Sequence, residues 1–176
     1  MVLMIFIGLG LKMQINNHLY IIKKQKMKSV FNPADVAELT DRINKLTPES
    51  KPLWGKMSVG QMLAHCNVAY EMVYTNKHPK PNFFMRLLIK MLAKSTVCGP
   101  RPYKKNLRTA PAFLMTEPRD FYTEKVRLIG YLNETLQLGE DHFEGKESLS
   151  FGKLSVDEWN TMFYKHLDHH LQQFGV

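Results

Sequence analysis

Three histidines have the spacing and setting of metal ligands. His166 and His170 are four residues apart, so at 100° per residue their side chains lie about 40° apart on one face of a helix. His65 lies in the apolar stripe of another predicted helix, together with Met62 and Ala69. Three imidazoles can bind a divalent cation and leave a coordination position for water or substrate, as catalytic sites do. The sequence therefore predicts a three-histidine metal site; the alternative is a set of core histidines that hydrogen-bond to their neighbours.

Two polar residues flank these histidines. His169 follows His166 by three residues, and Gln173 follows His170 by three. We interpret both as neighbours that surround the ligands. Gln173 is expected to orient a ligand or a bound water, and His169 either to support the ligands or to face solvent. The alternative for Gln173 is a glutamine frayed into solvent at the end of its helix.

Other reactive residues close to the histidines are weaker candidates. Cys66 adjoins His65, but neighbours on a helix point about 100° apart. Asp168 points away from the histidine stripe, and Glu71 is a weak candidate for a general base. The sequence has no glycine-rich phosphate loop, Cys-x-x-Cys pair or nucleophilic serine motif. Catalytic residues other than the metal ligands are therefore left unassigned.

Five amphipathic helices are expected to position these side chains. Asn32 followed by Pro33 predicts one helix start, and capping-box patterns begin at Ser58 and Ser155. The expected helices cover residues 32–47, 58–72, 82–94, 117–138 and 155–174. No segment has a convincing strand pattern. The sequence thus predicts an all-α fold, a four-helix bundle with a short extra helix at its N-terminal end.

The length and charge of the chain limit its class. Its 176 residues suit one domain, and its two cysteines are expected to be reduced thiols of a cytoplasmic protein. The net charge is +8, but residues 1–28 hold five lysines and no acid, which leaves +3 for residues 29–176. This distribution does not indicate a nucleic-acid partner.

The first 28 residues are interpreted as an N-terminal extension, and residues 29–176 as the folded domain. The apolar run at residues 2–11 is shorter than the roughly 20 residues that span a bilayer. Lysines follow this run, whereas a signal peptide has its basic residues in front. A membrane anchor or an export signal is the alternative interpretation.

A second basic region covers the middle of the chain. Between Met72 and Thr116 there are nine lysines and arginines and no acid. The helix expected at residues 82–94 has Phe84, Leu87, Leu88, Met91 and Leu92 on one side and Arg86, Lys90 and Lys94 on the other. Such a region can attract an anionic substrate or a membrane surface. We favour the simpler interpretation, a solvated face that pairs with acidic residues.

Several of these motifs together resemble a known family. The helix start from Ser58 to His65 and the late His166-x-x-x-His170-x-x-Gln173 are similar to the DinB-like superfamily. Residues 51–57, residues 152–154 with Glu158-Trp159, and the ending at residues 166–176 resemble a bacterial branch of it. The resemblance covers residues 27–176.

The resemblance implies a four-helix bundle in which three histidines bind zinc, nickel or iron. By position, these ligands are His65, His166 and His170. Characterised relatives include transferases and isomerases that use low-molecular-weight thiols, and a homodimer fits a bundle of this kind. We therefore expect a metal-dependent enzyme that transfers a thiol to a small electrophile, or else a hydrolase. The alternative is a bundle that binds metal or ligand without catalysis.

Overall fold

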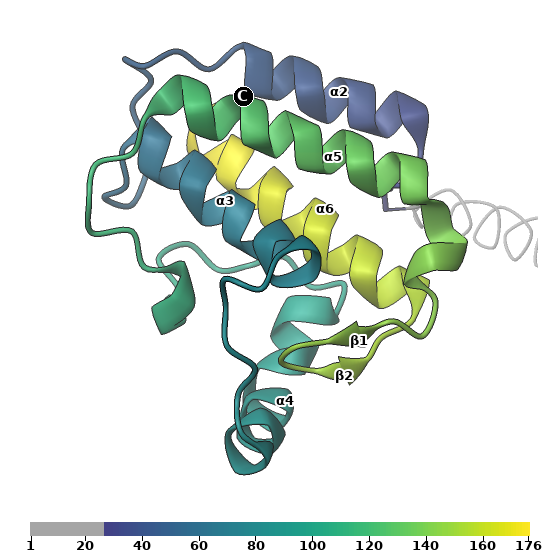
Figure 1. Ribbon diagram of the computed structural model, residues 1–176. Coiled ribbons are helices and arrows are strands. Elements are labelled where there is room, and N and C mark those ends of the chain that lie inside the picture. The colour runs from purple at the N-terminus through teal and green to yellow at the C-terminus, as the bar shows by residue number, and fades with distance from the viewer. Residues whose placement is uncertain (1–26) are drawn as a thin grey trace, which may run out of the picture.

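The computed structural model describes residues 27–176 and is mostly helical (Figure 1). Its elements are α2 (Pro33–Asn44), α3 (Val59–Tyr74), α4 (Phe83–Cys98), the 3-10 helix η1 (Pro111–Phe113), α5 (Phe121–Phe143), β1 (Glu147–Ser148), β2 (Gly152–Lys153) and α6 (Val156–Gln173). In Figure 1, α2, α3, α5 and α6 form the bundle and α4 projects from it. The predicted all-α bundle is confirmed. Most of the expected N-terminal extension lies outside the described residues.

Polar caps start the helices where the sequence predicts them. The side chains of Ser58 and Ser155 each accept a hydrogen bond from the third residue of their helix, and that residue's side chain accepts one in return. These capping boxes satisfy backbone N–H groups that have no partner within the helix. Asn32 caps α2 by accepting from the backbone of Ala34 and Asp35.

The longest helix continues past its expected end. Gly139 has a φ of +71° and kinks α5, but the helix resumes and ends at Phe143. Glycine adopts positive φ without the steric cost of a Cβ, so here it bends the helix instead of ending it. The start also differs from the expected residue 117, because Asp120 caps the helix through the backbone N–H of Thr123.

Two short strands were not predicted. They form an antiparallel hairpin that joins α5 to α6 and pairs Glu147 with Lys153 and Ser148 with Gly152. Each strand has two residues, which is too short to produce the alternating pattern from which strands are recognised.

Helix α3 lies against both α5 and α6, and most of its side chains are buried. Tyr70 stacks on Phe163 of α6 with ring centroids 4.6 Å apart. Trp159 packs on Phe163 at 5.5 Å, and Phe143 packs on Trp159 at 5.6 Å. This aromatic core fixes the alignment of α3 with α6, the two helices that carry the candidate ligands.

Helix α4 has the opposite orientation from most surface helices. Two of its basic side chains point toward other elements, where Arg86 pairs with Glu147 of the hairpin and Lys94 with Glu158 of α6. Its apolar side faces solvent, with Phe84 81% exposed and Met91 72% exposed. The inward side of α4 also carries Ile89, Ala93 and Val97, which pack against the core.

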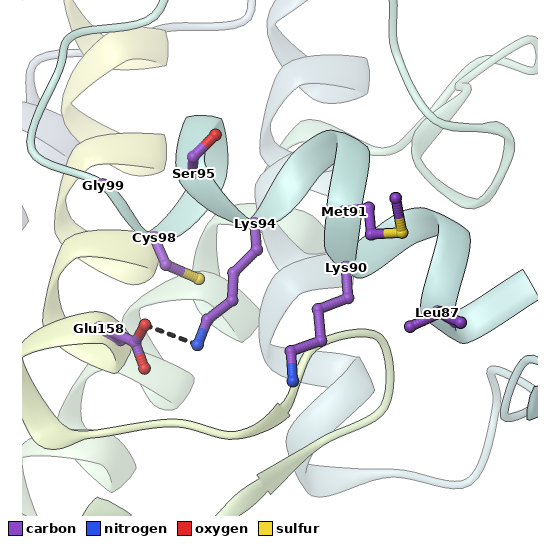
Figure 2. Close-up of a pocket in the computed structure, with 8 residues that line it drawn as sticks. All are labelled: Leu87, Lys90, Met91, Lys94, Ser95, Cys98, Gly99 and Glu158. Atoms are coloured by element: carbon purple, nitrogen blue, oxygen red, sulfur yellow. Dashed lines mark ion pairs between the residues drawn. The ribbon is translucent and has the colours of Figure 1, made fainter.

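A surface hollow of about 500 Å³ lies where α4 meets the start of α6. Figure 2 shows Lys94 reaching across it to Glu158, with Cys98 and Lys90 beside them. Of the α4 residues, only Cys98 is fully buried.

In residues 27–176, none of the helices combines the length and hydropathy needed to cross a membrane.

Candidate metal centre

Three imidazole rings meet between α3 and α6. His65 projects from α3, and His166 and His170 project from consecutive turns of α6. The ring centroids are 4.5 Å apart for His65 and His170, and 4.9 Å for each of the other two pairs. One nitrogen from each ring lies within 4.8 Å of the other two. A single ion placed among the rings can therefore reach all three histidines.

Carbonyl oxygens fix the tautomers of two of these rings. Nδ1–H of His65 donates to the backbone oxygen of Phe113 at 2.8 Å, and Nδ1–H of His170 donates to Oε1 of Gln173 at 2.8 Å. A neutral imidazole with its proton on Nδ1 has an unprotonated Nε2. Both rings thus offer Nε2 as a metal ligand, with the outer hydrogen bond typical of ligand histidines.

The shortest contact of the cluster is 2.9 Å, between Nε2 of His65 and Nε2 of His166. Two unprotonated nitrogens repel at this distance unless a proton or a cation lies between them. A proton on His166 satisfies that one contact, and a divalent cation satisfies all three rings. Metal–nitrogen bonds of about 2.1 Å place two ligand nitrogens about 3.0 Å apart at an octahedral angle and about 3.4 Å apart at a tetrahedral angle. The donor set therefore fits a divalent ion.

The three imidazoles are neutral at pH 7. Burial lowers the pKa of His65 and takes that of His166 well below the usual range, and nearby histidines add to the effect on His166. Burial and the neighbouring His65 lower the pKa of His170 to about 3, against a weaker opposing effect of Gln173. Neutral imidazole is the form that binds metals, so protons compete little for these ligands.

A protein-family model matches residues 23–175, and its description is "Protein of unknown function (DUF1569)". The chain belongs to the DUF1569 family. No curated protein and no solved structure matches the chain significantly. The mostly helical fold of this DUF1569 chain is consistent with the DinB-like resemblance.

Gln173 of the DUF1569 site is held in place by the segment at Trp54 and Gly55. Its Nε2 donates to the backbone oxygen of Trp54 at 2.6 Å, which orients Oε1 toward His170. The next residue, Gly55, has a φ of +84°, and a Cβ there would lie 2.5 Å from Nε2 of Gln173. Only glycine therefore allows the turn to approach this closely. Gly55 lies in residues 51–57, which carry part of the family resemblance. Its spacing from the histidines along the sequence forms no motif that would have predicted its role.

His169 lies outside the group of three. Its ring packs edge-on against Trp54 at 5.8 Å and Tyr103 at 5.5 Å. Tyr103 also approaches the ring of His166 at 6.4 Å, and Phe113 approaches it at 5.7 Å. Aromatic rings thus flank His166, which is half-buried, whereas His65 and His170 are buried.

A buried lysine holds the segment that carries Tyr103. Lys165 precedes His166 on α6, and its ammonium donates to the backbone oxygens of Thr96, Gly99 and Arg101. It also lies 4.6 Å from the centre of the Tyr103 ring. These contacts anchor the end of α4 and the following loop next to the imidazoles.

The weaker candidates lie outside the cluster. Asp168 pairs with Arg42 of α2 at 2.7 Å, and Glu71 pairs with Arg127. Cys66 is buried, which raises the pKa of its thiol well above the usual range. Among the described residues, the group with metal-ligand geometry contains three imidazoles and no carboxylate or thiol.

Replacement of Gln173 tests whether this amide supports the ligand. Gln173→Met removes the acceptor of His170 Nδ1–H, and we expect metal affinity to fall by roughly 10- to 100-fold. A competition titration against a chromogenic chelator measures the change. Gln172→Met is the matched control, because the exposed Gln172 side chain bonds Asp168 instead of a histidine. Equal affinities of the two variants would contradict this role of Gln173.

Proposed function

We propose that this DUF1569 protein is a divalent-metal-dependent enzyme that transfers a low-molecular-weight thiol to a small electrophile. The observation that carries the proposal is the convergence of three neutral imidazoles, two of them with Nε2 presented by a carbonyl-bound Nδ1–H. The resemblance to the DinB-like superfamily supports the reaction class. Zinc, nickel and iron all suit three imidazole nitrogens.

Three neutral ligands favour thiol chemistry. A divalent ion, when bound, supplies Lewis-acid chemistry that lowers the pKa of a thiol or a water molecule in the site. Because the ligand group contains no carboxylate, the protein does not reduce the charge of the ion, and this favours an anionic sulfur. His65 and His170 are held by their carbonyl partners, so they need little rearrangement to act as ligands.

The surroundings of His166 indicate where a substrate approaches. His166 is partly exposed, and the rings of Tyr103 and Phe113 flank it. Aromatic walls suit the carbon skeleton of a small electrophile. The ammonium of Lys105 lies 4.2 Å from the centre of the Trp54 ring, and Trp54 packs on His169. This cation adds positive charge near the candidate site and favours a carboxylate-bearing thiol.

The transfer requires little proton handling by side chains. The thiol loses its S–H proton to solvent, and sulfur bonds to the electrophilic carbon. With an alkyl halide the carbon–halogen bond breaks and halide leaves. With an epoxide a carbon–oxygen bond breaks, with an activated alkene the π bond breaks, and the resulting oxygen or carbon anion takes up a proton from solvent. Hydrolysis instead benefits from a general base close to the attacking water. The carboxylates of Glu71 and Asp168 already have cationic partners, Arg127 and Arg42, which favours thiol transfer over hydrolysis.

A thiol-consumption assay tests the reaction. Metal-loaded protein is mixed with N-acetylcysteine and, in turn, an alkyl halide, an epoxide and an activated alkene, and the remaining thiol is measured. We expect consumption above background with at least one electrophile, and a loss of roughly 100-fold or more in His166→Ala. His169→Ala is the control and retains metal and activity. Full metal content without thiol consumption would instead support the non-catalytic metal- or ligand-binding bundle.

A further inference from the structure

The apolar side of α4 is a candidate interaction surface. At 100° per residue, an arc of about 160° holds no charged side chain. The residues on this arc include Phe84, Met85, Leu87, Leu88, Met91 and Leu92, and all six are exposed. We call this set the α4 apolar face. Contiguous apolar patches of this kind mark interaction sites on soluble proteins.

The packing of α4 leaves this face uncovered by the described part of the chain. The helix contacts α6 and the hairpin through its other side, where Arg86 and Lys94 pair with Glu147 and Glu158. Ile89, Ala93 and Val97 pack against the core on the same side as these pairs. The apolar face therefore lies on the side of α4 that points away from the rest of the described chain.

The chain segment that contains α4 is strongly basic. Residues 72–116 hold nine lysines and arginines and no acid. Four of these cations pair with carboxylates of other segments. The other five have no ion pair with a described residue: Lys90, Arg101, Lys104, Lys105 and Arg108. The simpler interpretation, that this basic region is neutralised by acidic residues, thus accounts for only part of it.

We propose that α4 docks on an anionic lipid surface, with its apolar face among the acyl chains and the unpaired cations Lys90 and Arg101 near the headgroups. An exposed apolar face together with cations lacking internal partners is typical of helices that lie in a membrane interface. A second copy of this chain is the less favourable occupant, because it would bring two cationic regions together. This proposal is independent of the metal site.

Vesicle co-sedimentation of the full chain tests the proposal. The vesicles are phosphatidylcholine alone, or phosphatidylcholine with about 30 mol% phosphatidylglycerol. We expect binding to the anionic vesicles and a decrease of roughly tenfold or more in the double variant Phe84→Asp/Leu88→Asp. The matched control is Tyr122→Asp/Val126→Asp, which adds the same charge at exposed residues of α5 and retains most of the binding.

A second variant tests the electrostatic part. Lys90→Glu/Arg101→Glu leaves the apolar face intact, and we expect weaker binding to anionic vesicles with an unchanged Tm. Absence of wild-type binding would overturn the proposal. Equal binding by the wild type and the Phe84→Asp/Leu88→Asp variant would also overturn it, because residues outside α4 would then carry the interaction. The wild type could instead form a dimer that the Phe84→Asp/Leu88→Asp variant converts to a monomer, with no vesicle binding by either. That result would show that the α4 apolar face binds a second copy of the chain.

Discussion

We expect His166→Ala to abolish stoichiometric metal binding in protein purified without an affinity tag. Wild-type chain should hold about one divalent ion, and the variant should bind it roughly 100-fold or more weakly. His166 is one of the two partners in the 2.9 Å nitrogen–nitrogen contact, so its loss leaves two protein nitrogens for the ion. Elemental analysis by mass spectrometry gives the metal content and identifies the element.

The control for this experiment is His169→Ala. His169 neighbours the cluster and packs on Trp54 and Tyr103, but it lies outside the group of three. We expect this variant to retain the wild-type metal content. Equal metal content in His166→Ala and the wild type would contradict the assigned metal site, and with it the proposed enzyme function.

We expect the substitution Arg127→Met to lower the free energy of unfolding by about 3 kcal/mol. The guanidinium of Arg127 pairs with Glu71 of α3 and Glu124 of α5. Both glutamates are buried, with exposed fractions of 8% and 6%. Removing the cation leaves the buried Glu124 without an ion pair and leaves Glu71 with Lys77 and His78 alone. This costs more than the loss of an exposed pair.

Urea denaturation measures this loss, and Arg86→Met is the matched control. Arg86 pairs with Glu147, whose side chain is 52% exposed, so its loss should cost less than about 1 kcal/mol. A loss as small as this in Arg127→Met would contradict the assigned role of the buried pairs.

The ion pair between Arg127 and Glu71 also makes the free energy of unfolding depend on pH. Burial raises the pKa of Glu71, but hydrogen bonds from His78, Lys77 and Arg127 outweigh it and hold the pKa at about 2. A glutamate in the unfolded chain has a pKa of about 4.3. A carboxyl group whose pKa is lower in the folded state than in the unfolded state stabilises the fold at pH values above its unfolded pKa. This stabilisation is lost as the pH falls toward the folded pKa. The difference between wild type and Arg127→Met should therefore shrink below about pH 4.

The sequence was most informative where helices have regular apolar stripes and polar caps. Ser58 and Ser155 predicted the starts of α3 and α6, and both are confirmed. Periodicity placed His65, His166 and His170 on inward faces, and the structure brings their rings together. Binding of a metal by these rings stays a prediction, as does the domain boundary at residue 29.

Features that depend on distant contacts could not be predicted. The carbonyl of Phe113 and the turn at Gly55 support the imidazoles from segments with no periodic pattern. The inward side of α4 meets Glu147, which is 61 residues from Arg86 in the sequence, and packs Ile89, Ala93 and Val97 against the core. Helical periodicity separates the two sides of a helix, but it does not say which side packs inward when the cationic side finds carboxylates on other elements.

The position of α6 in the chain has a consequence for synthesis on the ribosome. This helix follows all the others, and it supplies His166 and His170 as well as Trp159 and Phe163 of the aromatic core. Asn160 also bonds the backbone of Lys28 and Val30, about 130 residues earlier. A nascent chain without α6 thus has neither a closed core nor converging imidazoles, so a metal ion could be captured only after α6 has emerged and could not guide the folding of the earlier helices.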